Sequence, residues 1–297
     1  MKIGIDLGGS HIGIGVIDLN GKIIEKRETD LSLEHTNNIE QFIKEYITEN
    51  VKEFLQKYKI EIIGIASPGT PKKGKITTLV NLGIQEFDIT SLLHEICKIP
   101  VIIQNDAKCA AIAEKKYGSL KNYTDAVFIC LGTGVGGAVF IDSKLLTPKR
   151  NPGSELGHMI IEKDGKLCNC GKKGCFETYC SMKRLKNKLI TALELPKDTT
   201  AQELLKVLKK RKQEENIKKI LDTDIEDLIV GLSNIIDIFE PEAICLGGSF
   251  VYFEELLYEC LVEKYYEKRY VFNKQNIPDL KLATLGNDAG MIGAGEE

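Results

Sequence analysis

The sequence predicts an α/β fold built from two similar halves. In the first half, short runs rich in isoleucine and valine alternate with segments whose apolar residues recur at helical spacing, in the order β-β-β-α-β-α-β-α. This order indicates a mixed sheet covered by helices. The pattern restarts near residue 125, and each half opens with two strands joined by a glycine-rich turn. The repeat spans about half the chain, which is too long a period for a solenoid.

The first half is expected to begin with three strands. Residues 2–30 contain three β-rich runs, with turns at Gly8-Gly9-Ser10 and Asn20-Gly21. Apolar residues at helical spacing then predict a helix at 37–58, and a strand at 60–67 follows. Beyond it we expect a helix at 88–97, a strand at 101–104 and a helix at 107–118.

The second half repeats this beginning. Strands are expected at 125–132 and 136–142, joined by Thr133-Gly134-Val135. A loop rich in cysteine follows, and a charge-rich helical section is expected from about 181 to 239, whose mixed charge signs are typical of a solvated helix face. The remaining expected elements are a strand at 243–248, a long helix from near Ser249, a strand at 281–286 and a helix start at 288–295.

The composition argues against several classes of protein. A chain of 297 residues suggests about two domains. The net charge of −3 argues against a nucleic-acid partner, and no apolar run approaches the ~18 residues of a membrane span. A strand pattern begins at Lys2 without a signal peptide, so we predict a cytoplasmic protein whose nine cysteines are free thiols or metal ligands.

The run at 153–180 combines metal-binding side chains with carboxylates. His158, Cys168, Cys170 and Cys175 are three thiols and one imidazole, which is enough to close a zinc site. The Cys-x-Cys spacing is tighter than that of zinc fingers, so reduced thiols in a surface loop remain the alternative. Glu155 and Glu177 bracket the run and are either solvated charges or ligands for a polar substrate. The other cysteines with apolar neighbours are expected to be small core residues: Cys97, Cys109, Cys130, Cys245 and Cys260.

The glycine-rich turns indicate phosphate binding. Residues 132–137 match G-x-G-x-x-G, but a strand follows where a dinucleotide-binding motif needs a helix. The remaining interpretation is a hairpin turn whose backbone N–H groups approach phosphate oxygens, and the alternative is a tight turn without a ligand. The turn at 6–11 has the same composition. One such turn in each half favours nucleotide phosphates held across a cleft, with Asp6 holding Mg²⁺ through water.

Asp106 is the candidate catalytic residue because it lies where a strand passes into a helix. A carboxylate there is either the helix N-cap, a role open to Asn105 or Asp106, or a base kept ionised by the helix dipole. An ionised carboxylate beside a substrate hydroxyl can accept its proton during phosphoryl transfer.

Together these motifs resemble the ROK family of repressors, open reading frames and kinases. The resemblance covers nearly the whole chain, and the combination of Glu-Leu-Gly-His with Cys-x-Cys-Gly-x-x-Gly-Cys-x-Glu is specific. The matching pieces are DLGGSH at 6–11, SPG at 67–69, NL at 81–82, QNDAKCAA at 104–111, LGTGVGGA at 131–138, PGSELGH at 152–158, CNCGKKGCFE at 168–177, LGG at 246–248 and LGNDAGMIGAG at 285–295.

The resemblance implies a fold and an activity. The fold is the two-domain actin-like ATPase (ribonuclease H-like) fold with a cleft between the domains, here 1–119 plus 285–297 and 120–284, the latter carrying the zinc loop. The activity is ATP-dependent transfer of phosphate to the 6-hydroxyl of a hexose, with glucose as first choice. The alternative is an N-acetylmannosamine or N-acetylglucosamine kinase, and a non-catalytic sugar-sensing regulator ranks third. A homodimer is also implied, without nucleic-acid or membrane partners.

The resemblance also assigns residues, with Asp106 as the general base. The implied sugar ligands are Gly69, Asn81, Asn105, Asp106, Glu155, His158 and Glu177. The implied ATP and Mg²⁺ ligands are Asp6, Gly8, Gly9, Ser10, Gly132, Thr133, Gly134, Gly136, Gly247 and Gly248. A structural Zn²⁺ would be bound by His158, Cys168, Cys170 and Cys175, with the second ring nitrogen of His158 facing the sugar.

Some positions depart from the family pattern. The chain has no Trp, which the sugar kinases often carry shortly after the Asn-Leu motif, and Leu82 or Phe87 is expected to fill that space. Ser10 replaces a commoner Thr and keeps the hydroxyl. The Cys-x-Cys pair lacks the second His of the fructokinase branch, which favours the glucokinase and N-acetylhexosamine kinase branch. The family's repressors carry an additional N-terminal DNA-binding segment, so a strand beginning at Lys2 favours a kinase.

Overall fold

The computed structural model describes residues 1–31, 38–68, 71, 74–79, 82–148, 153–267 and 277–296. The chain divides into two compact units, of which the first contains Met1–Lys121 and Thr284–Glu297 and the second contains Asn122–Ala283. Each unit has its own sheet and its own core. The expected functional domains, 1–119 plus 285–297 and 120–284 with the zinc loop, stay a prediction.

The first unit is built on a five-stranded sheet with the order β3-β2-β1-β4-β7. The strands β1 (Lys2–Leu7), β2 (His11–Ile17) and β3 (Ile23–Asp30) form an antiparallel meander, as their turns predicted. The strands β4 (Ile62–Ser67) and β7 (Val101–Asn105) extend the sheet from β1 in parallel. The predicted mixed sheet is therefore confirmed for this unit.

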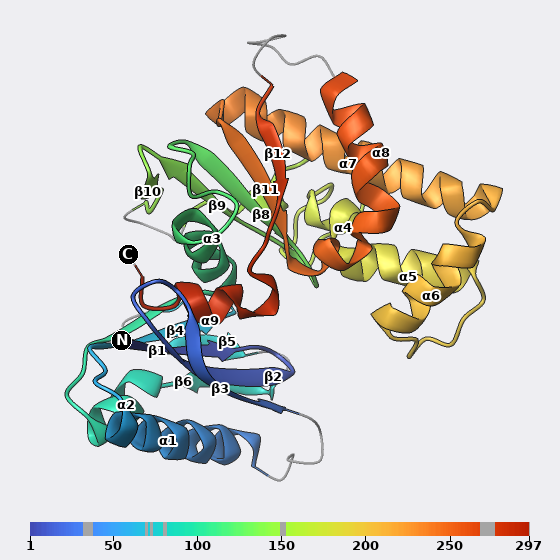
Figure 1. Ribbon diagram of the computed structural model, residues 1–297. Helices are drawn as coiled ribbons and strands as arrows, with labels where there is room; N and C mark the ends of the chain where they lie inside the picture. Colours follow the sequence, from blue (N-terminus) through green and yellow to red (C-terminus); the bar gives the residue numbers. More distant parts are fainter. Residues whose placement is uncertain are drawn as a thin grey trace. The chain divides into compact units, whose positions relative to one another are not determined.

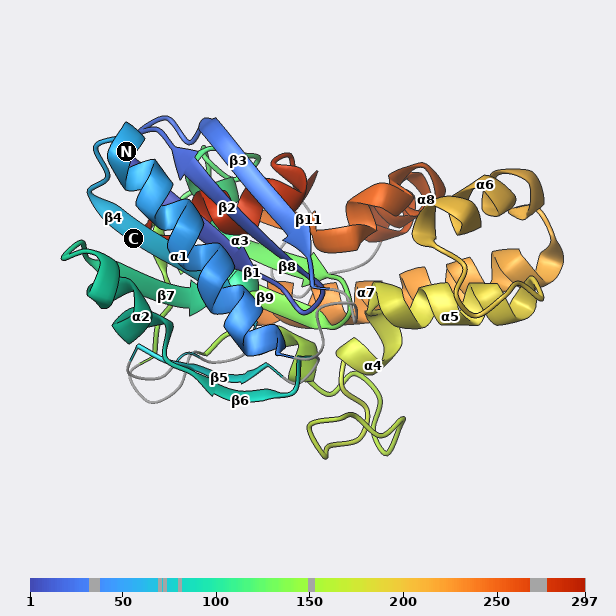
Figure 2. The same ribbon diagram turned by 90° about the horizontal axis from the view of Figure 1, so that it is seen from below.

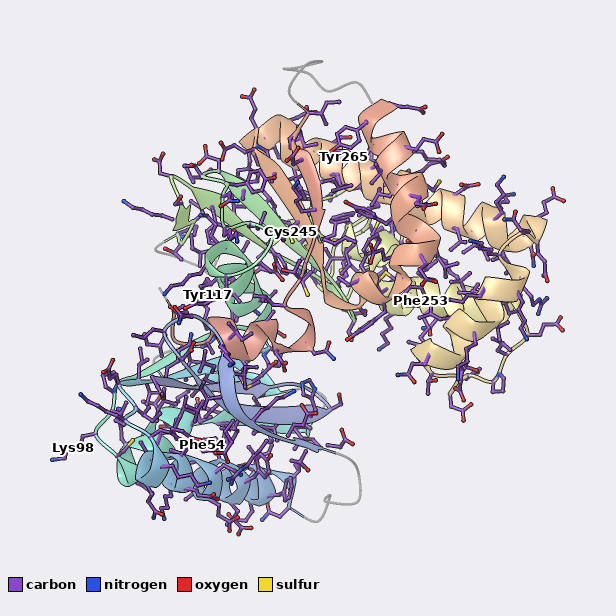
Figure 3. All side chains as sticks on the ribbon, viewed as in Figure 1. Phe54, Lys98, Tyr117, Cys245, Phe253 and Tyr265 are labelled. Atoms are coloured by element: carbon purple, nitrogen blue, oxygen red, sulfur yellow. The ribbon has the colours of Figure 1, made fainter. Side chains whose placement is uncertain are left out.

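One face of this sheet packs against α1 (Ile39–Lys57) and α2 (Ile89–Ile96), which lie together on that side (Figure 1). The apolar residues of α1 recur at helical spacing, and its N-cap Asn38 accepts a hydrogen bond from the backbone N–H of Gln41. Phe54 of α1 is fully buried in the core of this face and is labelled in Figure 3. Both helices were predicted within one or two residues of their bounds.

The other face carries α3 (Asp106–Lys116) and α9 (Ala289–Gly293), which pack closely on each other. Gly4 of β1 permits this approach, because a Cβ there would lie 2.1 Å from the carbonyl oxygen of Met291. Side chains alternate along a strand, so Asp6 lies on the same face as Gly4. The fold therefore places Asp6 and the helix that begins at Asp106 on one side of the sheet.

The second unit repeats the same topology in a sheet with the order β10-β9-β8-β11-β12. The strands β8 (Ala126–Leu131), β9 (Val135–Ile141) and β10 (Lys144–Leu145) are antiparallel. The strands β11 (Ala243–Gly247) and β12 (Asp279–Leu282) extend it from β8 in parallel. This pairing pattern is that of the first unit, so the internal repeat predicted from the two glycine-rich turns is confirmed. The short β10 was not predicted.

Helices pack on one face of the second sheet, where Val127, Ile129 and Leu131 of β8 enter the core. Phe253 and Tyr265, labelled in Figure 3, belong to the same core. The helix predicted near Ser249 begins as a 3₁₀ turn and becomes α-helical at Glu254. The α-helices of this unit, labelled in Figure 2, are α4 (Glu177–Cys180), α5 (Met182–Ala192), α6 (Ala201–Arg211), α7 (Glu215–Phe239) and α8 (Glu254–Glu267). The 3₁₀ turn that precedes α8 is η4 (Gly248–Phe253).

A small hairpin in the first unit was not predicted. Its strands β5 (Ile76–Leu79) and β6 (Ile84–Phe87) are four residues long, too short to give a clear alternation. The expectation that Leu82 or Phe87 fills the space of a missing Trp stays a prediction, and Phe87 is 1% exposed and packs in the α1–α2 core. Leu82 is only partly buried. None of the helices in the described ranges is long and apolar enough to span a bilayer.

Candidate active site and metal centre

Three cysteines and one histidine of the second unit converge on one point. The ligand atoms of His158, Cys168, Cys170 and Cys175 all lie within 4.8 Å of one another. Nδ1 of His158 is 3.8 Å from Sγ of Cys168, and the Sγ atoms of Cys170 and Cys175 are 3.6 Å apart. A tetrahedron of ligands about 2.3 Å from a zinc ion has edges of about 3.8 Å. The donor set and its spacing therefore fit a closed, four-coordinate zinc site.

Local turns build this cluster from a short stretch of sequence. The N–H of Cys168 donates to the carbonyl of Lys172, and the N–H of Gly171 donates back to Cys168 at 2.9 Å. Gly171 and Gly174 have φ values of +88° and +80°, which favour glycine. A Cβ at Gly174 would also lie 1.7 Å from the carbonyl oxygen of Glu162. The two glycines of the Cys-Gly-x-x-Gly-Cys pattern are thus required by the backbone conformation of the metal-binding loop.

Glu177 links this metal loop to the glycine-rich hairpin of β8 and β9. Its Oε2 accepts a 3.0 Å hydrogen bond from the backbone N–H of Val135, and its Oε1 lies 3.9 Å from Sγ of Cys168. A Cβ at Gly134 would lie 2.4 Å from the same Oε2, and one at Gly157 would lie 2.1 Å from the carbonyl oxygen of Val135. The hairpin and the metal loop therefore pack so closely that neither Gly134 nor Gly157 has room for a side chain.

The remaining predicted sugar ligands of this unit lie at a 3₁₀ turn, η3 (Leu156–His158). Glu155 precedes the turn and is exposed, and its carbonyl accepts the N–H of His158 at 3.0 Å. Since Nδ1 of His158 faces the thiol cluster, Nε2 is the ring atom left for a second partner. The role of both residues in sugar binding stays a prediction.

The hairpin offers fewer phosphate donors than its glycine content indicated. The N–H of Gly132 donates to the carbonyl of Gly134 at 2.9 Å, and that of Val135 is taken by Glu177. Gly136 lies within β9, opposite Cys130. The N–H groups of Thr133 and Gly134 and the hydroxyl of Thr133 are the remaining candidates in the turn.

The two glycines after β11 meet other parts of the second unit closely. A Cβ at Gly247 would lie 2.5 Å from the ring of Phe128, and one at Gly248 would lie 2.6 Å from the carbonyl oxygen of Leu131. Gly248 also has a φ of +70°. Packing therefore accounts for both residues, and their role in nucleotide binding stays a prediction.

In the first glycine-rich turn, too, some backbone N–H groups are bonded within the protein and others are left for a phosphate. The N–H of Gly8 donates to the carbonyl of His11 at 2.9 Å, which closes the turn. A Cβ at Gly8 would lie 2.8 Å from the His11 ring, so this glycine is also explained by packing. The donors that a phosphate could use here are those of Gly9 and Ser10.

Asp106 begins α3, and the residue before it caps the helix. The side chain of Asn105 accepts the N–H of Lys108 at 3.2 Å, so the N-cap is Asn105 and not Asp106. Oδ1 of Asp106 accepts the N–H of Ala107 at 2.7 Å and the side-chain amide of Asn105 at 3.0 Å. Burial raises the pKa of Asp106, and those hydrogen bonds oppose the rise. The carboxylate is thus held in place and is more basic than an exposed aspartate.

Asp6 is a second carboxylate with a raised pKa. Burial, followed by the charges of Asp106 and Asp288, raises its pKa to about 7. Asp6 lines a cavity of about 360 Å³ in the first unit, together with Glu28, Asp30 and Asp288. Lys26 lines the same cavity and is 2.8 Å from Asp288. A divalent cation would stabilise the ionised form of Asp6, as the predicted magnesium ligand requires.

Two predicted sugar ligands, Gly69 and Asn81, lie outside the described residues. Two contacts with bearing on the site were missed by the sequence analysis. One is the hydrogen bond from the backbone N–H of Val135 to Glu177. Gly134 and Gly157 leave room for it, because a Cβ at Gly134 would clash with Glu177 and one at Gly157 would clash with the backbone of Val135. The other is a set of hydrogen bonds to the buried Glu114 of α3, for which the sequence carried no signal.

Two sheets of the same mixed topology, each entered through a glycine-rich hairpin, define a protein of the actin-like ATPase fold. The model of the ROK family matches residues 2–296. The chain therefore belongs to the ROK family, and the predicted family and fold class are confirmed.

Relatives within the family include kinases and repressors. The chain is 29% identical to the glucokinase of Thermotoga maritima over 309 residues, covering 98% of this chain and 95% of the relative. It is 30% identical to the xylose repressor of Bacillus subtilis over 263 residues, covering 84% of this chain and 64% of the repressor. Among solved structures, the ROK hexokinase of Thermus thermophilus matches with a TM-score of 0.80 and 27% identity, covering 98% of this chain and 95% of that one.

Proposed function

We propose that the protein is an ATP-dependent hexose kinase that transfers the γ-phosphate of ATP to the 6-hydroxyl of glucose. Membership of the ROK family and the near full-length similarity to a glucokinase support this proposal. The observation that carries it is Asp106, a buried carboxylate with a raised pKa, fixed by hydrogen bonds where β7 passes into α3.

Asp106 acts as the general base toward the sugar hydroxyl. The hydrogen bonds from Ala107 and Asn105 both go to Oδ1, which orients the carboxylate and leaves Oδ2 for the substrate. A base whose pKa is raised toward neutral accepts a proton more readily than an exposed aspartate. Phosphoryl transfer itself needs positioning and neutralisation of charge more than covalent chemistry.

The metal loop orients the sugar. Glu155, His158 and Glu177 accept or donate hydrogen bonds to its hydroxyl groups, with Asn105, Gly69 and Asn81 completing the set. The zinc ion is structural, because four protein ligands leave no open coordination position for water. Its contribution is to hold the loop, and so Nε2 of His158, in one conformation.

ATP is held by the two glycine-rich turns. The available donors are the N–H groups of Gly9, Ser10, Thr133 and Gly134, with the glycines after β11 beside the nucleotide. Asp6 holds Mg²⁺ through water and its ionised form is favoured by that cation. When bound, Mg²⁺ neutralises charge that develops on the transferred phosphate.

Two other functions have support. An N-acetylmannosamine or N-acetylglucosamine kinase would use the same residues and differ in the space near the 2-position of the sugar. A non-catalytic sugar-sensing regulator is supported by the similarity to the Bacillus subtilis repressor. The position of Asp106 favours a kinase, since a sensor needs no base at the hydroxyl.

A coupled assay of ADP release tests the proposal. It compares glucose, mannose, xylose, N-acetylmannosamine and N-acetylglucosamine at fixed Mg-ATP, with a sugar-free sample as the background. We expect the largest increase over background with glucose. If an N-acetylhexosamine gave the largest increase, the protein would still be a sugar kinase, but its substrate would be that sugar and not glucose. Sugar binding seen by calorimetry without ADP release from any of the sugars would overturn the kinase and favour the regulator.

A further inference from the structure

The cavity that Asp6 lines lies over a glycine in the middle of β2. Asp6 of β1 pairs with Gly13 of β2, and Gly13 pairs with Glu28 of β3, so these three positions face the same side of the sheet. His11 lies two residues before Gly13 and faces that side as well. A Cβ at Gly13 would meet nothing within 4 Å. Gly13 is thus the floor of this cavity of about 360 Å³, and all of the lining residues belong to the first unit.

Neighbouring elements close the cavity at both ends of this stretch of β2. The next residue of β2 on the same face is Gly15, which Met291 of α9 covers, because a Cβ at Gly15 would lie 2.7 Å from Sδ of Met291. At the other end, the ring of His11 packs on the first glycine-rich turn. A Cβ at Gly8 would lie 2.8 Å from Cε1 and 2.9 Å from Nδ1 of that ring. The imidazole therefore lies at the edge of the cavity that is next to the turn proposed for phosphate.

Most charged groups of the cavity have a partner in the protein or face water. Nζ of Lys26 is 2.8 Å from Asp288 and is also paired with Glu28. Asp6 is partly buried, and within the described ranges its carboxylate forms no hydrogen bond and no ion pair. The ring of His11 likewise has no hydrogen bond or ion pair to any described residue. The protein thus leaves one carboxylate and one imidazole for a ligand.

We propose that this cavity receives a phosphate group of ATP together with its divalent cation, that His11 binds a phosphate oxygen there, and that Gly13 provides the space. Neither residue was predicted to bind a ligand from the sequence. The inference rests on the proposed function for the identity of the nucleotide, and it adds two residues to the binding of the phosphoryl donor.

A metal-bound phosphate matches this pair of groups because it offers both charges. The lining includes four carboxylates and two side chains that can carry a positive charge, Lys26 and His11, so an anion alone would be repelled. A cation alone would satisfy Asp6 and leave the imidazole without a partner. With both, the cation lies toward Asp6, and a ring N–H of His11 donates to a phosphate oxygen beside the free N–H groups of the turn.

Calorimetric binding of a non-hydrolysable Mg-ATP analogue to the whole protein, without sugar, tests the role of His11. His11→Ala removes the imidazole, and we expect binding to weaken roughly 10- to 150-fold, the range for a hydrogen bond to a charged group. The matched control His94→Ala removes an exposed imidazole of α2, which packs on the other face of the sheet, and should bind like the wild type. An affinity of His11→Ala within about twofold of the wild type would overturn the proposal. Absence of binding in the wild type would overturn it as well.

Gly13→Ala tests the floor of the cavity. Gly13 has no positive φ and the added methyl group meets no protein atom, so we expect the temperature of unfolding to stay that of the wild type or to rise. The methyl group occupies space that the phosphate needs, so binding of the analogue should weaken roughly 5- to 150-fold, as overpacking by one carbon does. Unchanged affinity in this variant would contradict the placement of the phosphate over Gly13.

A measurement on the wild-type protein guards against variants that do not fold. The ring nitrogen NMR resonances of His11, assigned through its own backbone, should shift when the Mg-ATP analogue or Mg-pyrophosphate is added and stay in place with adenosine. A shift with Mg-pyrophosphate but not with the Mg-ATP analogue would show that the phosphate is not that of the nucleotide and would overturn the proposal. Resonances that stay in place with both ligands would overturn it too.

The inference and the proposed function can fail separately. Nucleotide binding that depends on His11, in a protein that releases no ADP with any of the sugars, would keep the inference and overturn the kinase. ADP release with glucose by a His11→Ala variant whose Mg-ATP binding is unchanged would keep the kinase and overturn the inference.

Discussion

The backbone N–H of Val135 donates a 3.0 Å hydrogen bond to the carboxylate of Glu177. Val135 follows the glycine-rich turn proposed for phosphate, and Glu177 follows the last thiol of the metal loop. A single hydrogen bond therefore connects the proposed ATP turn with the proposed sugar loop inside the second unit. Loosening the metal loop should disturb the hairpin as well.

Gly134 is expected to be intolerant of a side chain because of this contact. In Gly134→Ala the new Cβ would lie 2.4 Å from Oε2 of Glu177, which must move and lose its hydrogen bond. We expect the free energy of unfolding to fall by about 1.5–3 kcal/mol, the range for a hydrogen bond to a charged group. The matched control is Gly132→Ala, whose Cβ would meet nothing within 4 Å. Urea unfolding of both variants measures the difference, and equal stabilities would contradict the packing argument.

The metal loop is expected to carry about one zinc ion per chain, bound by its four N and S ligands. Cys175→Ala should abolish metal binding and lower the temperature of unfolding by at least several degrees, because the ion holds the loop together. Cys97→Ala removes a cysteine of the first unit and should keep the metal. Metal analysis and thermal unfolding measure both effects. Full zinc content in Cys175→Ala would show that the cluster is not the site.

Zinc removal should also weaken sugar binding. Glu155 and His158 depend on the loop for their positions, so a chelated protein should bind glucose less tightly by calorimetry while ATP binding changes less. An unchanged affinity for glucose in protein shown to be free of metal would argue against the sugar role of this loop.

Asp6 should make stability depend on pH. Its pKa in the folded protein is raised from 3.8 to about 7, so the folded state holds a proton that the unfolded chain releases near pH 4. The resulting stabilisation is present below about pH 4 and is lost as the pH rises through about 7. Asp6→Asn does not titrate, so its free energy of unfolding relative to wild type should rise over this interval. The rise is a few kcal/mol at most, since one pKa unit corresponds to about 1.4 kcal/mol.

Denaturant unfolding of both proteins at several pH values measures this difference. A difference that stays constant from pH 4 to pH 8 would contradict the raised pKa. Added Mg²⁺ should diminish the slope, because a cation beside Asp6 favours the ionised carboxylate.

The elements with strong local patterns were predictable from the sequence. The isoleucine-rich strands β1, β2 and β4 and the helix α1 have clear periodicity, and the glycine-rich turns marked the start of each repeat. The metal cluster was predictable because four ligand types lie in one short run. The hairpin β5–β6 was missed because four-residue strands carry too little alternation.

Contacts between distant segments were not predictable. The glycines of the hairpin were interpreted as phosphate donors, whereas Gly134 also makes room for Glu177, which is 43 positions away in the chain. Glu114 meets Thr284 across 170 positions, and nothing in either local sequence indicates the other. The choice between Asn105 and Asp106 as N-cap likewise depended on side-chain geometry. Such pairings are set by tertiary packing, which a local pattern does not contain.

The most direct test of the account is the turnover of Asp106→Asn with glucose and Mg-ATP, measured by ADP release beside a calorimetric measurement of glucose binding. The substitution keeps the size of the side chain and one accepting oxygen but removes the base. We predict a loss of turnover of roughly 10²- to 10⁴-fold, the usual contribution of general base catalysis, with glucose binding retained. Turnover within about threefold of the wild type would show that Asp106 is not the base and would contradict the central claim.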